Sequence, residues 1–202
     1  MSRVTILMYH MVSDPVTEND QRYACSPQLF RRHMQFLRDN DYNLTSLDWF
    51  LEAREKSLSV PDRSIIVTFD DGFEDNYLNA FPILEETKTP ATIFVATGVV
   101  GGTNSWMEGQ GFSLQPMLSW SQIDQMAKAG ITIASHTVSH PRLTQLTLDQ
   151  VEEEVSTSKA LLEDRLGSSV DHFAYPYGLE SVEIQKVVQR CGYRSACSTR
   201  SG

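Results

Sequence analysis

Residues 64–72 read SIIVTFDDG, an apolar run followed directly by two carboxylates and a glycine. The run from Ile65 to Val67 is typical of a buried β-strand. In α/β folds the carboxyl ends of such strands carry the chemistry. We therefore predict an α/β fold in which Asp70 and Asp71 lie at the carboxyl end of a strand. The alternative interpretation is an inert Asp-Asp-Gly turn.

A second stretch, residues 131–141, reads ITIASHTVSHP and places His136 and His140 after another short apolar run. Pro141 disfavours a helix that would include both histidines. A catalytic divalent metal takes about three protein ligands and keeps positions open for water and substrate. Asp71, His136 and His140 would supply those ligands and leave Asp70 free as a base that activates water. The alternative for the histidines is a polar loop that caps the next element.

Strand-like and helix-like segments alternate along the rest of the chain. This run of βα units predicts a parallel sheet covered by helices, or a barrel. At 202 residues the chain is expected to be one domain, residues 1–202. Strands are predicted at residues 4–8, 64–69, 91–95, 131–134, 173–175 and 193–196, and helices at residues 26–37, 46–55, 77–84, 119–129, 147–166 and 182–190.

Residues 98–116 interrupt this rhythm with five glycines and no hydrophobic periodicity. A long segment of this kind in a compact domain is often a functional loop. The alternative is a mobile surface loop without a role.

The charge of the chain limits its partners. It carries 26 acidic and 17 basic residues, a net charge of −9, without a basic run. This composition argues against nucleic acid or an anionic membrane surface and favours a neutral or cationic substrate. No apolar stretch reaches the ~20 residues of a membrane-spanning helix, and residues 1–11 do not resemble a signal peptide. The chain as written is therefore expected to be cytoplasmic, with its oligomeric state left open.

Three motifs resemble those of the polysaccharide deacetylases, the NodB-homology or carbohydrate esterase family 4 enzymes. They are TFDDG at residues 68–72, the His136 and His140 pair, and FAYPYG at residues 173–178. The resemblance implies a distorted (β/α)7-type barrel, with a closing strand and helix absent or beyond the end of the chain. It also implies metal-dependent removal of N-acetyl groups from an amino-sugar glycan, or of O-acetyl groups from xylan.

The same resemblance assigns roles to particular residues. Asp70 is the base, and Asp71, His136 and His140 bind the metal. Pro176 and Tyr177 line the substrate groove, where the Tyr177 N–H would help to hold the oxyanion. Zinc is the expected metal, although iron, cobalt and manganese suit the same ligands.

The sequence departs from the family pattern at two places. Ala174 stands where the family usually has an arginine, and no Leu-x-His follows Tyr193. The chain instead opens with LMYH at residues 7–10, which resembles the circularly permuted branch of poly-N-acetylglucosamine deacetylases. His10 is then the candidate acid, and a strand-end histidine bonded to the backbone is the alternative.

Three aromatic residues are candidates for contact with a sugar. Trp120, Trp106 and Tyr177 could stack on sugar faces, or simply anchor core and loops.

The expected partner is an acetylated amino-sugar glycan. The alternatives are a non-catalytic glycan-binding pseudo-enzyme and a metal-dependent amidase that acts on a small non-sugar amide. His172 is the next candidate acid if His10 fails.

Overall fold

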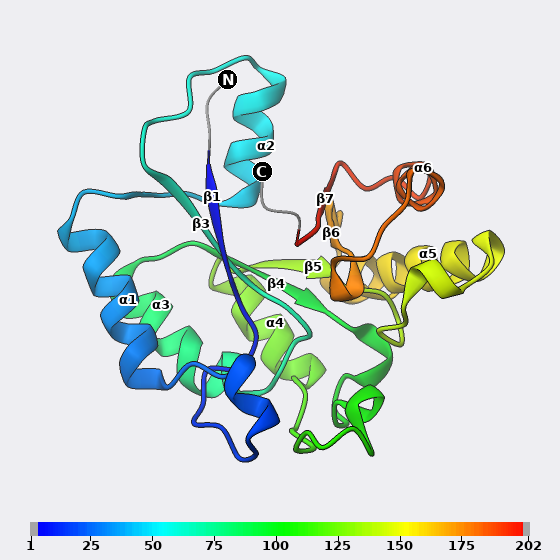
Figure 1. The fold of residues 1–202 in the computed structure, drawn as a ribbon. Helices are drawn as coiled ribbons and strands as arrows, with labels where there is room; N and C mark the ends of the chain where they lie inside the picture. The colour runs from blue at the N-terminus through cyan, green and yellow to red at the C-terminus, as the bar shows by residue number, and fades with distance from the viewer. Residues whose placement is uncertain (1–3, 200–202) are drawn as a thin grey trace.

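The computed structural model describes residues 4–199, and its centre is one parallel sheet that curls into a half-barrel (Figure 1). The sheet has seven strands in the order β1-β3-β4-β5-β6-β7, with β2 beside the start of β3. This architecture confirms the expected distorted barrel of the NodB kind. The strands are β1 (Thr5–Tyr9), β2 (Asn43–Leu44), β3 (Ser64–Phe69), β4 (Ala91–Val95), β5 (Thr132–Ser135), β6 (His172–Ala174) and β7 (Ser195–Cys197).

Side chains alternate between the two faces of the curled sheet, as the pleat of a strand requires. On the outer face, Ile65, Val67 and Phe69 of β3 join the main core under the helices. On the inner face, a smaller cluster contains Ile66 of β3, Phe94 of β4, and three further residues, Leu47, Ala134 and Ala174. All six residues of β3 are buried because both of its faces are covered.

Most of the helices pack along the outside of the curl, and the helix that begins at Leu47 lies at the amino-terminal end of the strands (Figure 1). Most begin at the cap residues that the sequence predicts: Ser26, Ser46, Ser119 and Thr147 each accept a hydrogen bond in the first turn, which satisfies an otherwise orphaned N–H. The helices are α1 (Pro27–Asp39), α2 (Leu47–Glu55), α3 (Phe81–Thr87), α4 (Trp120–Lys128), α5 (Leu148–Leu166) and α6 (Val182–Arg190). Over residues 4–199, no helix has the length and apolar character needed to cross a lipid bilayer.

Two local features differ from the sequence-based expectation. The strand β2 was not expected, since two residues are too short to show any periodicity. The helix expected over residues 77–84 is instead a π-helical turn, Asn76–Ala80, followed by α3. Pro82 follows the π-helical turn directly and lies in the first turn of α3.

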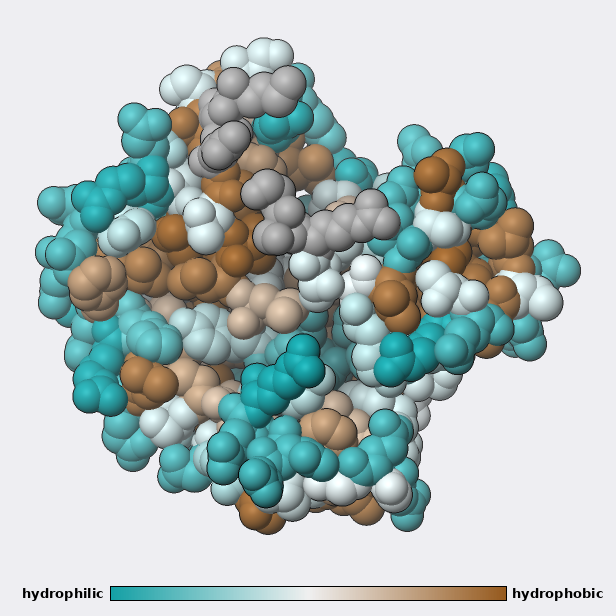
Figure 2. Space-filling view, viewed as in Figure 1, coloured by the Kyte–Doolittle hydropathy of each residue, from teal (hydrophilic) through white to brown (hydrophobic). Residues whose placement is uncertain are grey.

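The barrel is open between β1 and β7, which do not pair within residues 4–199. A cleft of about 530 Å³ enters there, lined by Ile6 and Met8 from β1 and by Cys197 from β7. Ile6 and Met8 are 40% and 47% exposed because no strand covers them. Figure 2 shows a hollow near the middle of this face, to the right of the surface over β1.

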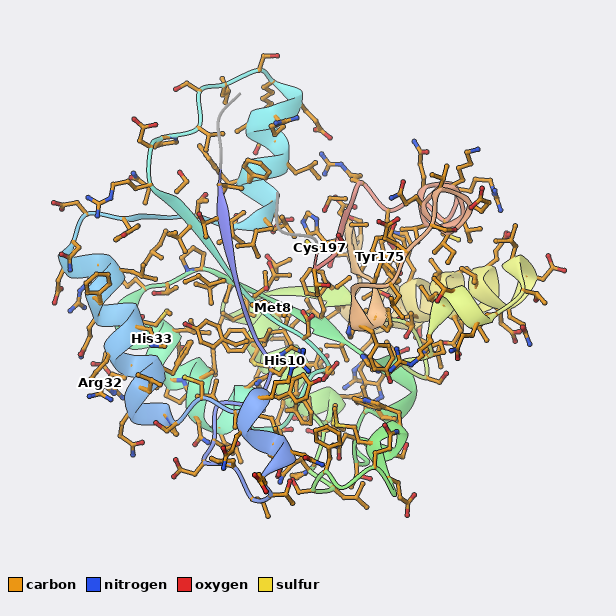
Figure 3. All side chains as sticks on the ribbon, in the orientation of Figure 1. Met8, His10, Arg32, His33, Tyr175 and Cys197 are labelled. Carbon is orange, nitrogen blue, oxygen red and sulfur yellow. The ribbon has the colours of Figure 1, made fainter. Side chains whose placement is uncertain are left out.

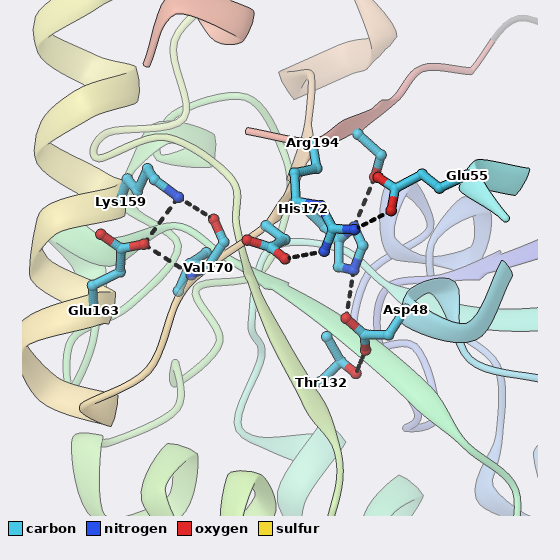
Figure 4. Close-up of polar contacts among 10 residues, drawn as sticks. Asp48, Glu55, Thr132, Lys159, Glu163, Val170, His172 and Arg194 are labelled. Atoms are coloured by element: carbon cyan, nitrogen blue, oxygen red, sulfur yellow. Dashed lines mark hydrogen bonds and ion pairs between the residues drawn. The ribbon is translucent and has the colours of Figure 1, made fainter. Parts of the chain in front are cut away.

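The amino-terminal end of the sheet is closed by a polar network that holds α2 in place (Figure 4). His172, buried at the start of β6, contacts Asp48 of α2 through Nε2 at 2.8 Å and Ser195 through Nδ1 at 2.7 Å. The Thr132 hydroxyl donates to the other Asp48 oxygen at 2.6 Å. Arg194 pairs with Glu55 of α2 at 2.7 Å. His172 is therefore a structural residue at the end of the sheet opposite Asp70.

We expect Asp48→Ala to lower the free energy of unfolding more than Asp149→Ala does, by about 1–3 kcal/mol. Both aspartates occupy the second position of a helix, so the loss of a favourable interaction with the helix dipole is matched. Only Asp48→Ala leaves the buried His172 and Thr132 without their partner. Urea denaturation of both variants measures the difference, and equal losses would show that the network contributes nothing.

Candidate metal centre

Asp71, His136 and His140 meet at the carboxyl ends of the strands, as the sequence predicts. Their ligand atoms all lie within 4.8 Å of one another, and all three residues are buried. Asp71 Oδ1 lies 3.1 Å from His140 Nε2 and 3.4 Å from His136 Nε2. Two imidazole nitrogens and one carboxylate oxygen therefore point at a common position.

The alternation of the strands explains how these side chains reach one place. Asp70 continues the inward-facing row of Ile66 and Thr68 on β3, and it lines the inner cleft together with Thr68. His136 follows Ser135 at the end of β5 and continues the inward row of Ala134. Asp71 would face the other way on a regular strand. Its left-handed backbone, with φ of 75°, turns it into the site instead.

Left-handed backbone is concentrated around this position. Eight non-glycine residues among the described ones have positive φ, and four of them, Asp71, Thr137, His140 and Tyr177, belong to the site or its loops. Thr137 is the costliest, because a β-branched residue is rarely found in this region. Such strain persists only where the surrounding structure holds it, and it gathers at functional sites.

Glu154 of α5 holds the loop that carries the histidines. Its carboxylate accepts hydrogen bonds from the backbone N–H groups of Val138 and Ser139, both at 2.9 Å, and from the Ser139 hydroxyl at 2.6 Å. The Thr137 hydroxyl accepts from the His140 N–H at 3.0 Å. These bonds fix the backbone between the two histidines. No local pattern in the sequence indicates this role of Glu154.

The polar atoms at the centre fit a bound cation. His136 Nδ1 contacts the carbonyl of Ala174 at 2.8 Å, which leaves Nε2 to act as a ligand. Within residues 4–199, Asp71 Oδ1 faces both Nε2 atoms but is buried without a hydrogen bond of good geometry, and His140 Nδ1 is also buried without a partner. An unpaired buried carboxylate oxygen is costly, and a divalent metal would relieve that cost. The donor set suits zinc, iron, cobalt or manganese.

The two adjacent aspartates differ in electrostatic environment. Burial raises the pKa of Asp70, and its nearby histidines only partly oppose this. Burial would also raise the pKa of Asp71, but His140 and His136 outweigh it and hold that pKa well below its usual range. Asp71 therefore stays ionised as a ligand should, whereas Asp70 is the carboxyl group more ready to take up a proton.

A cavity of about 430 Å³ opens above the cluster, and His10 lines it. Its lining includes His10, Asp70, Asp71, His136, His140 and Tyr177. Strand β1 lies beside β3 with Tyr9 opposite Phe69, so His10 follows β1 where Asp70 follows β3. Figure 3 shows Met8 and His10 along β1, with Tyr175 and Cys197 across the opening.

The His10 ring contacts the ring of Tyr23, with centroids 5.1 Å apart. It is the backbone carbonyl of His10, not the imidazole, that accepts a hydrogen bond from Asn76. Two histidines remain. His33 of α1 contacts the Tyr9 hydroxyl, and His172 lies at the far end of the sheet. The cavity therefore holds one histidine besides the two ligands.

The aromatic candidates separate into two groups. Tyr177 lines the cavity, and its ring packs on His140 with centroids 4.7 Å apart. Pro176 is buried beside it. Trp120 is partly buried against the main core at the start of α4 and does not line the cavity. Trp106 packs on His140 with centroids 4.5 Å apart, so it supports a ligand of the cluster.

Residues 98–116 form an ordered part of the site. Met107 lines the cavity beside Trp106. Asp20 anchors the segment, because its carboxylate accepts from the Ser113 hydroxyl at 2.7 Å and from the Ser113 N–H at 3.2 Å. The functional interpretation of this loop is the one that the structure favours.

Ala174 has no side chain that could reach Asp70, as the sequence indicates. Its backbone carbonyl instead orients His136. Among residues 4–199, no side chain donates a hydrogen bond to the Asp70 carboxylate, and the charged groups that act on it are His136, His10, Asp71 and His140. The orienting arginine of the family pattern thus has no direct substitute in this part of the chain.

Comparison with known proteins places this geometry in a family context. A family model of polysaccharide deacetylases matches residues 57–196. The Bacillus subtilis protein YxkH is 31% identical over 207 residues, which cover 100% of this chain and 66% of YxkH. A poly-beta-1,6-N-acetyl-D-glucosamine N-deacetylase of Staphylococcus aureus is 29% identical over 183 residues, 86% of this chain and 60% of that protein. The chain thus spans two thirds or less of these relatives.

A solved structure agrees with the sequence comparison. The Streptococcus pyogenes deacetylase PplD, in complex with acetate, superimposes with a TM-score of 0.83 at 27% identity. The match covers 98% of this chain and 84% of PplD.

We expect Glu154→Ala to weaken binding of a divalent metal about 10- to 100-fold, because the loop between His136 and His140 loses its anchor. Asp71→Ala, which removes a ligand, should abolish binding. The matched control is Glu153→Ala, an exposed neighbour on α5 that should leave affinity unchanged. Competition with a chelator measures all three, and wild-type affinity in Glu154→Ala would contradict the anchoring role.

Proposed function

This chain belongs to the polysaccharide deacetylase family, and on that premise we propose that it is a metal-dependent N-deacetylase that removes acetyl groups from an amino-sugar glycan. The observation that carries the proposal is the cavity in which Asp71, His136 and His140 converge while Asp70 stays free beside them. A pure metal site needs no second buried carboxylate. A hydrolytic site needs one as a base.

A divalent metal on the three ligands, with zinc the expected ion, would polarise the acetyl carbonyl and lower the pKa of water. Asp70 takes the proton of the attacking water as its oxygen bonds to the acetyl carbon. The raised pKa of Asp70 makes this carboxylate a stronger base than an exposed one. The Tyr177 N–H donates to the developing oxyanion, an interaction typically worth a few kcal/mol.

His10 completes the reaction by donating a proton to the departing amine. The carbon–nitrogen bond then breaks and leaves acetate and a free amino sugar. Without an acid the leaving group would be a strongly basic amide anion. His10 suits this role because it lines the cavity and its ring has no hydrogen-bond partner among the described residues.

The substrate follows from the relatives and from the shape of the site. A relative that matches 86% of this chain is named for poly-beta-1,6-N-acetyl-D-glucosamine, which supports an acetylated amino-sugar polymer here. Met8, Asp70 and Thr199 line both the cavity and the inner cleft, so the two spaces join. Such a space suits a sugar chain better than a small amide.

The test is acetate release by the metal-loaded chain from oligomers of β-1,6- and β-1,4-linked N-acetylglucosamine, acetylated xylan and a small acetamide. We expect turnover of the amino-sugar oligomers. Binding without acetate release would instead indicate a glycan-binding pseudo-enzyme, and turnover of the acetamide alone would indicate an amidase.

Asp70→Asn should reduce acetate release at least ~100-fold while metal stays bound, because the amide keeps the shape of the side chain but cannot accept the proton. Asp71→Asn is the matched partner and should lose metal as well as activity. Elemental analysis beside the activity assay separates the two roles. Loss of metal from Asp70→Asn alone would mean that the two aspartates exchange roles.

His10→Ala should lower hydrolysis of an N-acetyl sugar by ~100-fold or more and largely spare an activated aryl acetate ester, whose phenolate leaves without a proton. His33→Ala, on the outer helix α1, is the control that should leave both rates near wild type (Figure 3). The ratio of the two rates is the measurement. Equal losses on both substrates would exclude His10 as the acid.

A further inference from the structure

In a chain that is acidic overall, two arginines lie in or beside the lining of the cavity, and we call Arg22, Arg142 and the two tyrosines they contact, Tyr23 and Tyr177, its mouth. Arg22 lines the cavity directly. The guanidinium of Arg142 lies 4.2 Å from the ring centroid of Tyr177, which also lines it. Both arginines are exposed, and within residues 4–199 neither forms an ion pair with a carboxylate. Their charges are therefore available to a ligand.

Each arginine is connected to a histidine of the site through one tyrosine. The Tyr177 ring contacts His140 at 4.7 Å and Arg142 at 4.2 Å. The Tyr23 ring contacts His10 at 5.1 Å and Arg22 at 5.8 Å. A guanidinium over an aromatic ring is partly immobilised, while its N–H edge stays free to donate. Tyr177 and Tyr23 therefore hold the two guanidinium groups close to His140 and His10.

The local charge differs from the charge of the whole chain. Among the described residues, Asp70 and Asp71 are the acidic ones that line the cavity. A divalent cation on the metal ligands would neutralise both, so the arginines would leave the mouth positive. Asp20 and Glu154 lie nearby but do not line the cavity, and their carboxylates accept hydrogen bonds from the surrounding loops. The net charge of −9 therefore does not describe what the substrate meets.

We infer that the substrate carries an anionic group, a carboxylate or a phosphate, close to the acetylated amino sugar that enters the cavity. This inference rests on the proposed deacetylase function and names the class of glycan that the site prefers. The planar fork of an arginine matches the oxygens of either group with two parallel hydrogen bonds. A neutral glycan would leave both arginines without a partner.

The experiment compares three oligosaccharides of equal length on the metal-loaded Asp70→Asn variant, which should bind without turnover. One probe is a neutral N-acetylglucosamine oligomer, one alternates N-acetylglucosamine with the carboxylate-bearing N-acetylmuramic acid, and one carries a phosphate monoester. We expect at least one acidic probe to bind about fivefold more tightly or better than the neutral one. Whichever is preferred identifies the source of the anion, and the preference should shrink as salt rises.

Arginine variants in the same Asp70→Asn background decide whether the preference arises at this mouth. Arg22→Gln and Arg142→Gln should each reduce the acidic-to-neutral affinity ratio by about two- to fivefold, and Arg142→Lys should keep part of it. Arg32→Gln is the matched control, because Arg32 is exposed on α1 away from His10 (Figure 3). It should leave the ratio unchanged.

Two results would overturn the inference: equal binding of acidic and neutral probes, or an acidic preference that survives both glutamine substitutions. Failure of the proposed function looks different. The chain with Asp70 intact would then release no acetate from any probe, whereas the affinity ratio of the Asp70→Asn variant would still be measured.

Discussion

The site depends on the period-two alternation of the parallel strands and on one departure from it. Asp70 and His136 lie inside the curl because they continue rows that already face inward on β3 and β5. Asp71, the next residue after Asp70, can join them only through its left-handed backbone. With a regular backbone at this position, the metal ligand and the free carboxylate would lie on opposite faces of the sheet.

The two ends of the half-barrel differ in how their polar atoms are paired. At the amino-terminal end, Asp48, Thr132, His172 and Ser195 satisfy one another's polar atoms and tie α2 to the sheet. At the carboxyl end, Asp71 and His140 retain buried polar atoms without partners, and the backbone is strained. The strained carboxyl end is held by contacts such as those of Glu154.

The pKa values and the charge at the cavity are determined by the residues that lie next to it. The two histidines beside Asp71 and the burial of Asp70 move the pKa values of adjacent carboxyl groups in opposite directions. Two arginines at the mouth oppose the overall charge of the chain. Because salt screens exposed charges over about one Debye length, the residues that line or adjoin the cavity dominate its electrostatic potential.

Much of this protein was determined by its sequence alone. The apolar runs before Asp70 and before His136 predicted their strands, and the metal ligands could be named because each follows a strand directly. The family resemblance, carried by three short motifs, was confirmed by the comparisons. These features are local in sequence, so periodicity and spacing are enough to recognise them.

Only the tertiary structure decided which distant residues share the cavity. It brought His10 beside Asp70 through the pairing of β1 with β3 and sent His172 to the opposite end of the sheet. It packed Trp120 against the main core rather than in the cavity, and it brought Glu154, Arg22 and Arg142 to the site or its rim. The physical reason is that strand pairing and loop closure set these contacts across long separations in the chain, and no local pattern encodes which side chain will arrive.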